Sequence, residues 1–211
     1  MIVLDHLVIT AANLEEGTRE IETLLGLPLA PGGRHDAFGT HNRLLSLGPE
    51  LYLEVIAIDP DAPPPGRIRW YNLDGAKDAI PRGGQTGPLS AARFTHWAVR
   101  SDTFEADLSR ALPGTGTPLS LQRGDFRWRM AVPETGRLPL DDVAPAYLTW
   151  ESAHPAPRLP DLGVRLERLE IIHPAVADLP LPDDPRVQAK AGPRALGAVL
   201  STPNGPKRLP S

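Results

Sequence analysis

The sequence predicts an α+β fold made of two β-α-β-β-β units, followed by a partial third unit. Two observations support this prediction. The stretches DHLVIT (residues 5–10) and THWAVR (residues 95–100) are alike, each a short β-prone run with a histidine in second place. After each stretch, the same order of helix, turn and strand patterns follows along the chain. A duplicated unit explains this echo better than chance does.

The first unit begins with an expected strand over residues 2–10. Asn13 is a suitable N-cap for a helix with Glu15 and Glu16 in its first turn, where the helix dipole favours acidic side chains, and Gly26 ends the apolar helical spacing. Strands over residues 33–38 and 40–47 flank a tight turn at Gly39, and LYLEVIAI within residues 50–58 is a further strand. A loop rich in proline and glycine follows at 59–66. Residues 67–92 favour no single assignment, although a short helix is one option for 74–80.

The second unit repeats this order. A strand over residues 93–99 precedes a helix that Asp102 would cap, then a hairpin of residues 119–123 and 126–132, and a last strand AYLTWE at 146–151. A weaker echo, LERLEII at 166–172, places Arg168 where His6 stands, and residues 194–202 form another strand candidate. The stretch 178–185 is too rich in proline and aspartate for regular structure. We therefore expect modules at 1–60 and 93–154, a linker at 61–92 and an extension at 155–211, together in one compact domain.

Composition excludes several classes of function. The 211 residues are 41% hydrophobic and 23% charged, as in a globular protein, and the net charge of −4 argues against a nucleic-acid-binding surface. There is no cysteine, which excludes disulfides, thiolate metal sites and cysteine nucleophiles. The N-terminus lacks the basic region of a signal peptide, and no run approaches the ~20 apolar residues of a membrane span. We expect a cytoplasmic protein with no membrane or nucleic-acid partner.

The duplicated histidines point to a metal site. Glu54 is the one charged residue in its strand, and strand alternation puts it on the face of Tyr52 and Ile56. His96 takes the place of His6 in the second unit. Two imidazole nitrogens and one carboxylate oxygen would hold a divalent ion such as Zn, Ni, Mn, Fe or Mg and leave positions for water or substrate. The alternative is that each histidine is a half-buried strand residue bonded to backbone; the duplication favours His6, Glu54 and His96 as metal ligands.

These residues and motifs resemble the vicinal oxygen chelate superfamily, which includes glyoxalase I, extradiol dioxygenases and bleomycin-resistance proteins. More narrowly, the chain is similar to glyoxalase-like domain proteins. The resemblance rests on the opening DHLVI, on GGRHDAFGTHNRLLSLG from Gly32, and on LYLEVIAI, and it covers residues 2–154. It implies paired βαβββ modules that form a curved mixed sheet around a shared cleft. It also implies one metal ligand on the first strand and one on the last strand of each module.

Carried over by position, the ligands are His6, Glu54, His96 and the residue at Thr149, where AYLTW aligns with LYLEV. A neutral hydroxyl is a poor replacement for a carboxylate. Three alternatives stay open: Glu151 supplies the missing oxygen, three protein ligands act with water, or metal binding is lost. A carboxylate not occupied by metal, either Glu54 or Glu151, could act as a catalytic base.

The motif GTHN and the histidine before it supply candidates for substrate binding, namely His35, His41 and Asn42. The alternative is turn chemistry, in which Gly39 provides a positive φ and Asn42 bonds to backbone. Alternation turns Trp97 and Trp150 away from the face of the proposed ligands, and His154 and His173 look structural or exposed.

The resemblance implies a metal-dependent lyase, isomerase or dioxygenase acting on a small oxygenated substrate. The alternative is a non-catalytic protein of the resistance type that binds a small molecule in the same cleft. Related folds often dimerise, so a homodimer is an open expectation.

Overall fold

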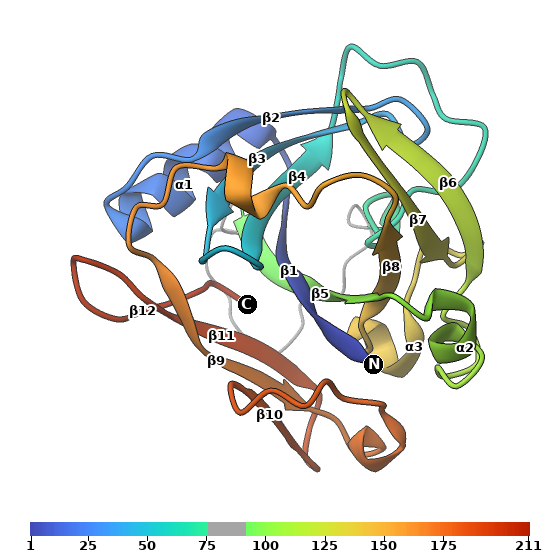
Figure 1. The fold of residues 1–211 in the computed structure, drawn as a ribbon. Coiled ribbons are helices and arrows are strands. Elements are labelled where there is room, and N and C mark those ends of the chain that lie inside the picture. The colour runs from blue at the N-terminus through green and yellow to red at the C-terminus, as the bar shows by residue number, and fades with distance from the viewer. Residues whose placement is uncertain (76–91) are drawn as a thin grey trace.

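The computed structural model describes residues 1–75 and 92–211 and confirms the α+β prediction. Eight strands form one strongly curled sheet in the order β2-β3-β4-β1-β5-β8-β7-β6 (Figure 1). The first unit contributes β1 (Ile2–Ala11), α1 (Leu14–Leu25), β2 (Ala30–His35), β3 (Thr40–Ser46) and β4 (Tyr52–Ile58). The second unit contributes β5 (Ala92–Ser101), α2 (Phe104–Leu108), β6 (Thr117–Arg123), β7 (Phe126–Val132), the short α3 (Pro139–Asp142) and β8 (Ala146–Trp150).

The helix of the first unit has the expected ends. The Asn13 side chain accepts hydrogen bonds from the backbone N–H groups of Glu15 and Glu16, and Gly26 ends the helix at a φ of 69°. The second helix differs from expectation, because α2 is only five residues long and follows Thr103 rather than a capping Asp102. The helix expected over 74–80 lies mostly outside the described residues.

The C-terminal segment forms a second sheet of four strands in the order β10-β9-β11-β12, drawn in orange and red in Figure 1. Between β8 and β9 lies a 3-10 turn, η2, and a second, η3, links β9 to β10. Arg168, which the sequence aligns with His6, pairs with Glu170 at 2.8 Å. The strands and turns of this segment are β9 (Arg165–Ile172), β10 (Val187–Lys190), β11 (Ala195–Ser201), β12 (Lys207–Arg208), η2 (Ala156–Arg158) and η3 (Val176–Asp178).

The two faces of the curled sheet bury different clusters. The outer face packs on α1 and on the second sheet, so that Leu7 and Trp97 share a core with Leu169 and Leu200. The inner, concave face carries Val8 together with Trp128, Met130 and Leu148 and other apolar side chains. Among the described residues, no helix is long and apolar enough to cross a membrane.

Candidate functional site

The strand register gathers three of the predicted residues around Val8 on the concave face. Val8 pairs with Glu54 on one side and with His96 on the other, and His6 lies two residues before it on the same strand. Paired residues share a face of the sheet, as do residues i and i+2. The backbone therefore places His6, Glu54 and His96 on one face, as the duplication predicts.

A β-bulge in β1 brings Asp5 to the same site. The pairing with β5 shifts between Leu4 and His6, so Asp5 is the extra residue. A bulge re-aims side chains, and Leu4 accordingly lies in the outer core whereas His6 lies on the concave face. The Asp5 Oδ1 atom is 2.6 Å from His6 Nδ1. Simple alternation would have turned these two neighbours to opposite faces.

Asp5 is fully buried, and its carboxylate accepts hydrogen bonds from three side chains. His6 binds one of its oxygens, and the other accepts hydrogen bonds from Trp150 Nε1 at 2.8 Å and His154 Nε2 at 3.1 Å. Burial opposes the charge, but the hydrogen bonds from His154 and His6 outweigh it and hold the pKa of Asp5 well below its usual range. A charged Asp5 keeps the proton of His6 on Nδ1, which leaves Nε2 to face the pocket.

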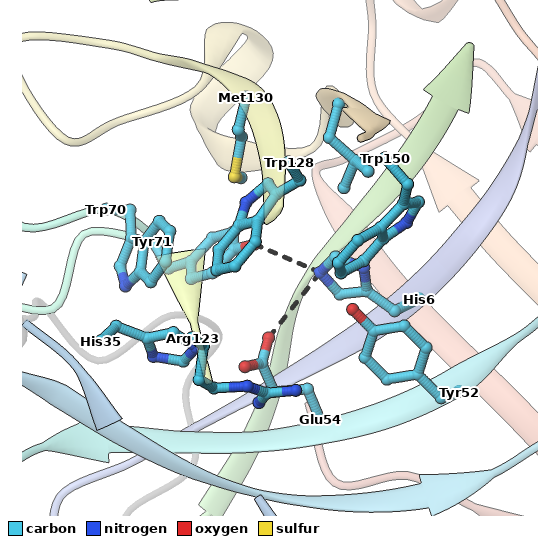
Figure 2. Close-up of a pocket in the computed structure, with 11 residues that line it drawn as sticks. His6, His35, Tyr52, Glu54, Trp70, Tyr71, Arg123, Trp128, Met130 and Trp150 are labelled. Carbon is cyan, nitrogen blue, oxygen red and sulfur yellow. Dashed lines mark hydrogen bonds and ion pairs between the residues drawn. The ribbon is translucent and has the colours of Figure 1, made fainter. Parts of the chain in front are cut away.

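The Nε2 atom of His6 meets two groups, as Figure 2 shows with dashed lines. It lies 3.7 Å from Glu54 Oε2 and 3.3 Å from the hydroxyl of Tyr71. The ring of His6 stacks on Tyr52 with centroids 4.7 Å apart. Asp5 therefore sets the tautomer of this imidazole, and the contacts with Tyr71, Glu54 and Tyr52 fix its orientation.

Glu54 is held in turn by a relay of hydrogen bonds, which runs through Asn42 to both edge strands of the sheet. Asn42 donates from Nδ2 to Glu54 Oε1 at 2.5 Å, and its Oδ1 accepts from Arg123 at 2.8 Å and from the backbone N–H of Gly33 at 2.8 Å. Arg123 ends β6, and β6 and β2, the two edge strands of the sheet, are in contact. Gly32 leaves the space that Asn42 fills, since a Cβ there would overlap the Asn42 side chain.

His6, Glu54 and Arg123 line a pocket with about 340 Å³ of space free of protein atoms, part of it open to solvent. Its walls are mainly aromatic, and its polar groups are those of His6, Glu54, His35 and Arg123 (Figure 2). Burial, and then the charge of Arg123, hold the pKa of His35 well below its ordinary value of 6.5, so this imidazole is neutral. The apolar and aromatic lining consists of Tyr52, Trp70, Tyr71, Trp128, Met130, Leu148 and Trp150.

His96 lies outside this pocket, on the other side of Tyr71. The Tyr71 ring is 5.1 Å from the His96 ring between centroids, and His96 Nε2 is 3.8 Å from Asp142 Oδ1. Within residues 1–75 and 92–211, no group of three or more His, Cys, Asp or Glu side chains is placed to hold a metal ion. His6 and Glu54 come together as predicted, but His96 does not join them. The donor set present does not fit the three-ligand divalent site expected from the sequence.

The remaining predicted residues have different positions. His35 lines the pocket, with its Nδ1 3.1 Å from the Thr40 hydroxyl, and Asn42 holds Glu54. His41 pairs with Ala57, a residue of the outer core, and does not line the pocket. Glu151 is exposed just beyond β8 and is also absent from the pocket wall.

The alignment of AYLTW on LYLEV needs correction. In the first unit Val8 pairs with Glu54, and in the second unit the corresponding Ala98 pairs with Ala146. Ala146, rather than Thr149, is therefore the counterpart of Glu54. Thr149 alternates with Leu148 and Trp150, which line the pocket, so it faces away. The expectation that Trp150 faces away is wrong for the same reason.

Three site residues were not singled out as functional from the sequence, namely Asp5, Tyr71 and Arg123, and a fourth, His154, was expected to be structural or exposed. Asp5 adjoins a candidate ligand, and a charged residue inside a β-prone run was a usable signal. Tyr71 lies in a loop, and Arg123 lies at the end of a strand. His154 follows the last strand of the second unit. No local pattern marks such positions, because only the closed fold brings them to His6, Asn42 and Asp5.

Comparisons with known proteins agree with this architecture. The family model described as a glyoxalase-like domain matches residues 4–180. A search of curated proteins gave no match. A solved structure of a hypothetical protein from Staphylococcus aureus is similar with a TM-score of 0.54 and 13% identity, over 99% of this chain and 85% of that one, which supports the fold alone. The extent of the family match, over most of the chain, shows that this protein belongs to the glyoxalase-like domain family of the vicinal oxygen chelate superfamily.

Proposed function

We propose that this protein binds a small carbonyl compound in the aromatic pocket and moves a proton of that compound through His6 Nε2. The observation that carries the proposal is the fixed imidazole: Nδ1 is held by buried Asp5 at 2.6 Å, and Nε2 faces the pocket 3.7 Å from Glu54. A carboxylate that orients a histidine is the common support of a general base. Among the lyases and isomerases that the family implies, the proposal therefore selects enzymes whose reaction proceeds by proton transfer.

The residues divide the work as follows. His6 Nε2 takes a proton from the carbon next to the carbonyl, and the negative Glu54 stabilises the imidazolium that forms. Arg123, the guanidinium that lines the pocket, stabilises negative charge developing on the substrate oxygen. Return of the proton to the same or a neighbouring carbon completes an exchange or an isomerisation. No step is assigned to the divalent ion of metal-using relatives, because the donors do not fit one.

The proposal is tested by hydrogen–deuterium exchange of small hydroxycarbonyl and dicarbonyl compounds in D₂O, followed by proton NMR. Wild-type protein should accelerate loss of the α-proton signal of at least one compound. His6→Ala should slow that exchange by about 10²–10⁴-fold, the usual contribution of a general base. Glu54→Gln should slow it less. His173→Ala and Glu167→Gln, on or beside the C-terminal sheet, are the matched controls and should leave the rate unchanged.

A second candidate is binding without catalysis, as the resistance-type alternative implies. Its support is the wall itself, since five aromatic side chains line the pocket. Fluorescence of the pocket tryptophans reports binding directly. Saturable quenching without any proton exchange would favour this candidate, and a panel with neither response would contradict both.

A further inference from the structure

Tyr71 stands where a metal ion shared by His6 and His96 would have to lie. His6 and His96 are diagonal neighbours on adjacent antiparallel strands of one face. Such positions are roughly 7–8 Å apart, within reach of a common ion for two imidazoles. The Tyr71 hydroxyl instead approaches His6 Nε2 at 3.3 Å, and its ring lies 5.1 Å from that of His96. The backbone thus presents a metal-site arrangement, and one side chain fills its centre.

The Tyr71 side chain is buried, and its hydroxyl lies within hydrogen-bond distance of His6 Nε2. A protonated hydroxyl donates a hydrogen bond to the free lone pair of His6 Nε2, the same lone pair that a metal would need.

The loop that carries Tyr71 is anchored firmly. Trp70, next to it, stacks on Phe38 with centroids 4.0 Å apart, and the backbone N–H of Asn72 donates to Gly136 O at 2.8 Å. Tyr71 and Asn72 both have left-handed backbone conformations, with φ of 54° and 53°. Such conformations cost about 1–3 kcal/mol each for non-glycine residues and persist where the surroundings impose them, often at functional sites.

We propose that Tyr71 closes the divalent metal site that His6, Glu54 and His96 would otherwise form. The inference shares an atom with the proposed proton transfer, because the Tyr71 hydroxyl occupies the His6 Nε2 lone pair that a substrate would have to reach. Its test is metal binding, which is read separately from proton exchange. Removal of the ring should open the site.

The test is titration of purified protein with ZnCl₂, followed by calorimetry, with CoCl₂ absorption spectra as an independent readout of coordination. Wild type should show no site that depends on His96. Tyr71→Ala should gain one equivalent of bound Zn²⁺, and the gain should vanish in Tyr71→Ala/His96→Ala. Tyr71→Phe keeps the ring in place and should gain no site.

Four results would overturn the inference. The first is a folded Tyr71→Ala, judged by circular dichroism, that gains no metal. The second is a gain in Tyr71→Ala that survives loss of His96. The third is a gain in Tyr71→Phe equal to that of Tyr71→Ala. The fourth needs no Tyr71 variant: wild-type protein that binds one Zn²⁺ and loses it on His96→Ala. This comparison decides the matter even where Tyr71→Ala does not fold.

Discussion

The two histidines of the duplicated unit occupy the same backbone feature but have different neighbours. In each unit a β-bulge lies immediately before the histidine, at Asp5 in β1 and at Thr95 in β5. In each unit the bulged side chain contacts the histidine Nδ1, at 2.6 Å for Asp5 and 2.8 Å for Thr95. The duplication therefore extends to the bulge, and the units differ in having a carboxylate or a hydroxyl there.

This difference shows how one repeat can support chemistry in one copy alone. Asp5 is charged and accepts hydrogen bonds from Trp150 and His154 at the end of the second unit. Among the described residues, the Thr95 hydroxyl has hydrogen-bond contacts with Thr10 and His96 alone. The second unit thus supplies two of the hydrogen-bond donors to Asp5, the carboxylate that orients the histidine of the first unit. A duplicated backbone provides matching positions, and the side chains that arrive later in the chain decide which position becomes a site.

The largest expected effect comes from truncating the two bulged side chains. Asp5→Ala leaves the buried His6 and the partly buried Trp150 and His154 without their acceptor and should lower the free energy of unfolding by about 3–5 kcal/mol. Thr95→Ala removes one neutral hydrogen-bonding group and should cost about 1 kcal/mol. Urea denaturation followed by circular dichroism measures both. Equal losses would show that the carboxylate is no better integrated than the hydroxyl and would remove the asymmetry between the two units.

Much of this arrangement could be predicted from the sequence. The echo of DHLVIT in THWAVR predicts two matching first strands, and LYLEVIAI predicts the strand that carries Glu54; together they place the three donors around Val8. The alignment of the last strand failed because AYLTW and LYLEV match in letters but not in register. A shift of one residue in register turns every side chain of a strand to the other face, and a match in letters alone does not fix which residue of the partner strand is paired.

The chemistry of the site was harder to predict. Tyr71 comes from a loop between the units, and Arg123 acts across the line where the two edge strands meet. Their positions depend on the curl of the whole sheet. The metal prediction assumed that donors on one face converge, and no pattern in the sequence announced the aromatic ring between them.

A smaller effect should come from the glycine pair that supports Glu54, a carboxylate for which the second unit has Ala146. Gly32→Ala would push a methyl group into the side chain and carbonyl of Asn42 and should cost about 1–3 kcal/mol, while also displacing the relay to Glu54. Gly33→Ala would meet the flexible stem of Arg123 at 2.9 Å, so its cost should be lower. Thermal melts rank the two variants. A larger loss for Gly33→Ala would mean that Arg123, rather than Asn42, is the fixed member of the relay.

The smallest expected effect concerns pH and separates the neutral histidine of the pocket from the charged carboxylates. The folded-state pKa of His35 is depressed, so below about pH 6.5 the unfolded chain takes up a proton that the folded protein does not. Stability should therefore fall on acidification through this range, at a slope of up to about 1.4 kcal/mol per pH unit for one such group. His35→Phe, which keeps a ring beside Trp70, should flatten the slope between pH 6.5 and 5. His41→Ala is the comparison variant. Burial also lowers the pKa of His41, so this variant measures how much of the slope comes from a histidine outside the pocket.

The carboxylates act in a different window. The pKa of Asp5 is held far below 3.8, and that of Asp142 falls to about 2 because the hydrogen bond and charge of His96 and further donors outweigh burial. Their stabilisation is present above the unfolded value near 3.8 and is lost only as the pH falls through the folded values. Denaturation midpoints measured from pH 7 to pH 2 should thus show two separate declines. If His35→Phe leaves the decline between pH 6.5 and 5 unchanged, His35 is not the neutral imidazole of the pocket. If Asp5→Asn abolishes that decline, it belongs to Asp5 and its attribution to His35 is wrong.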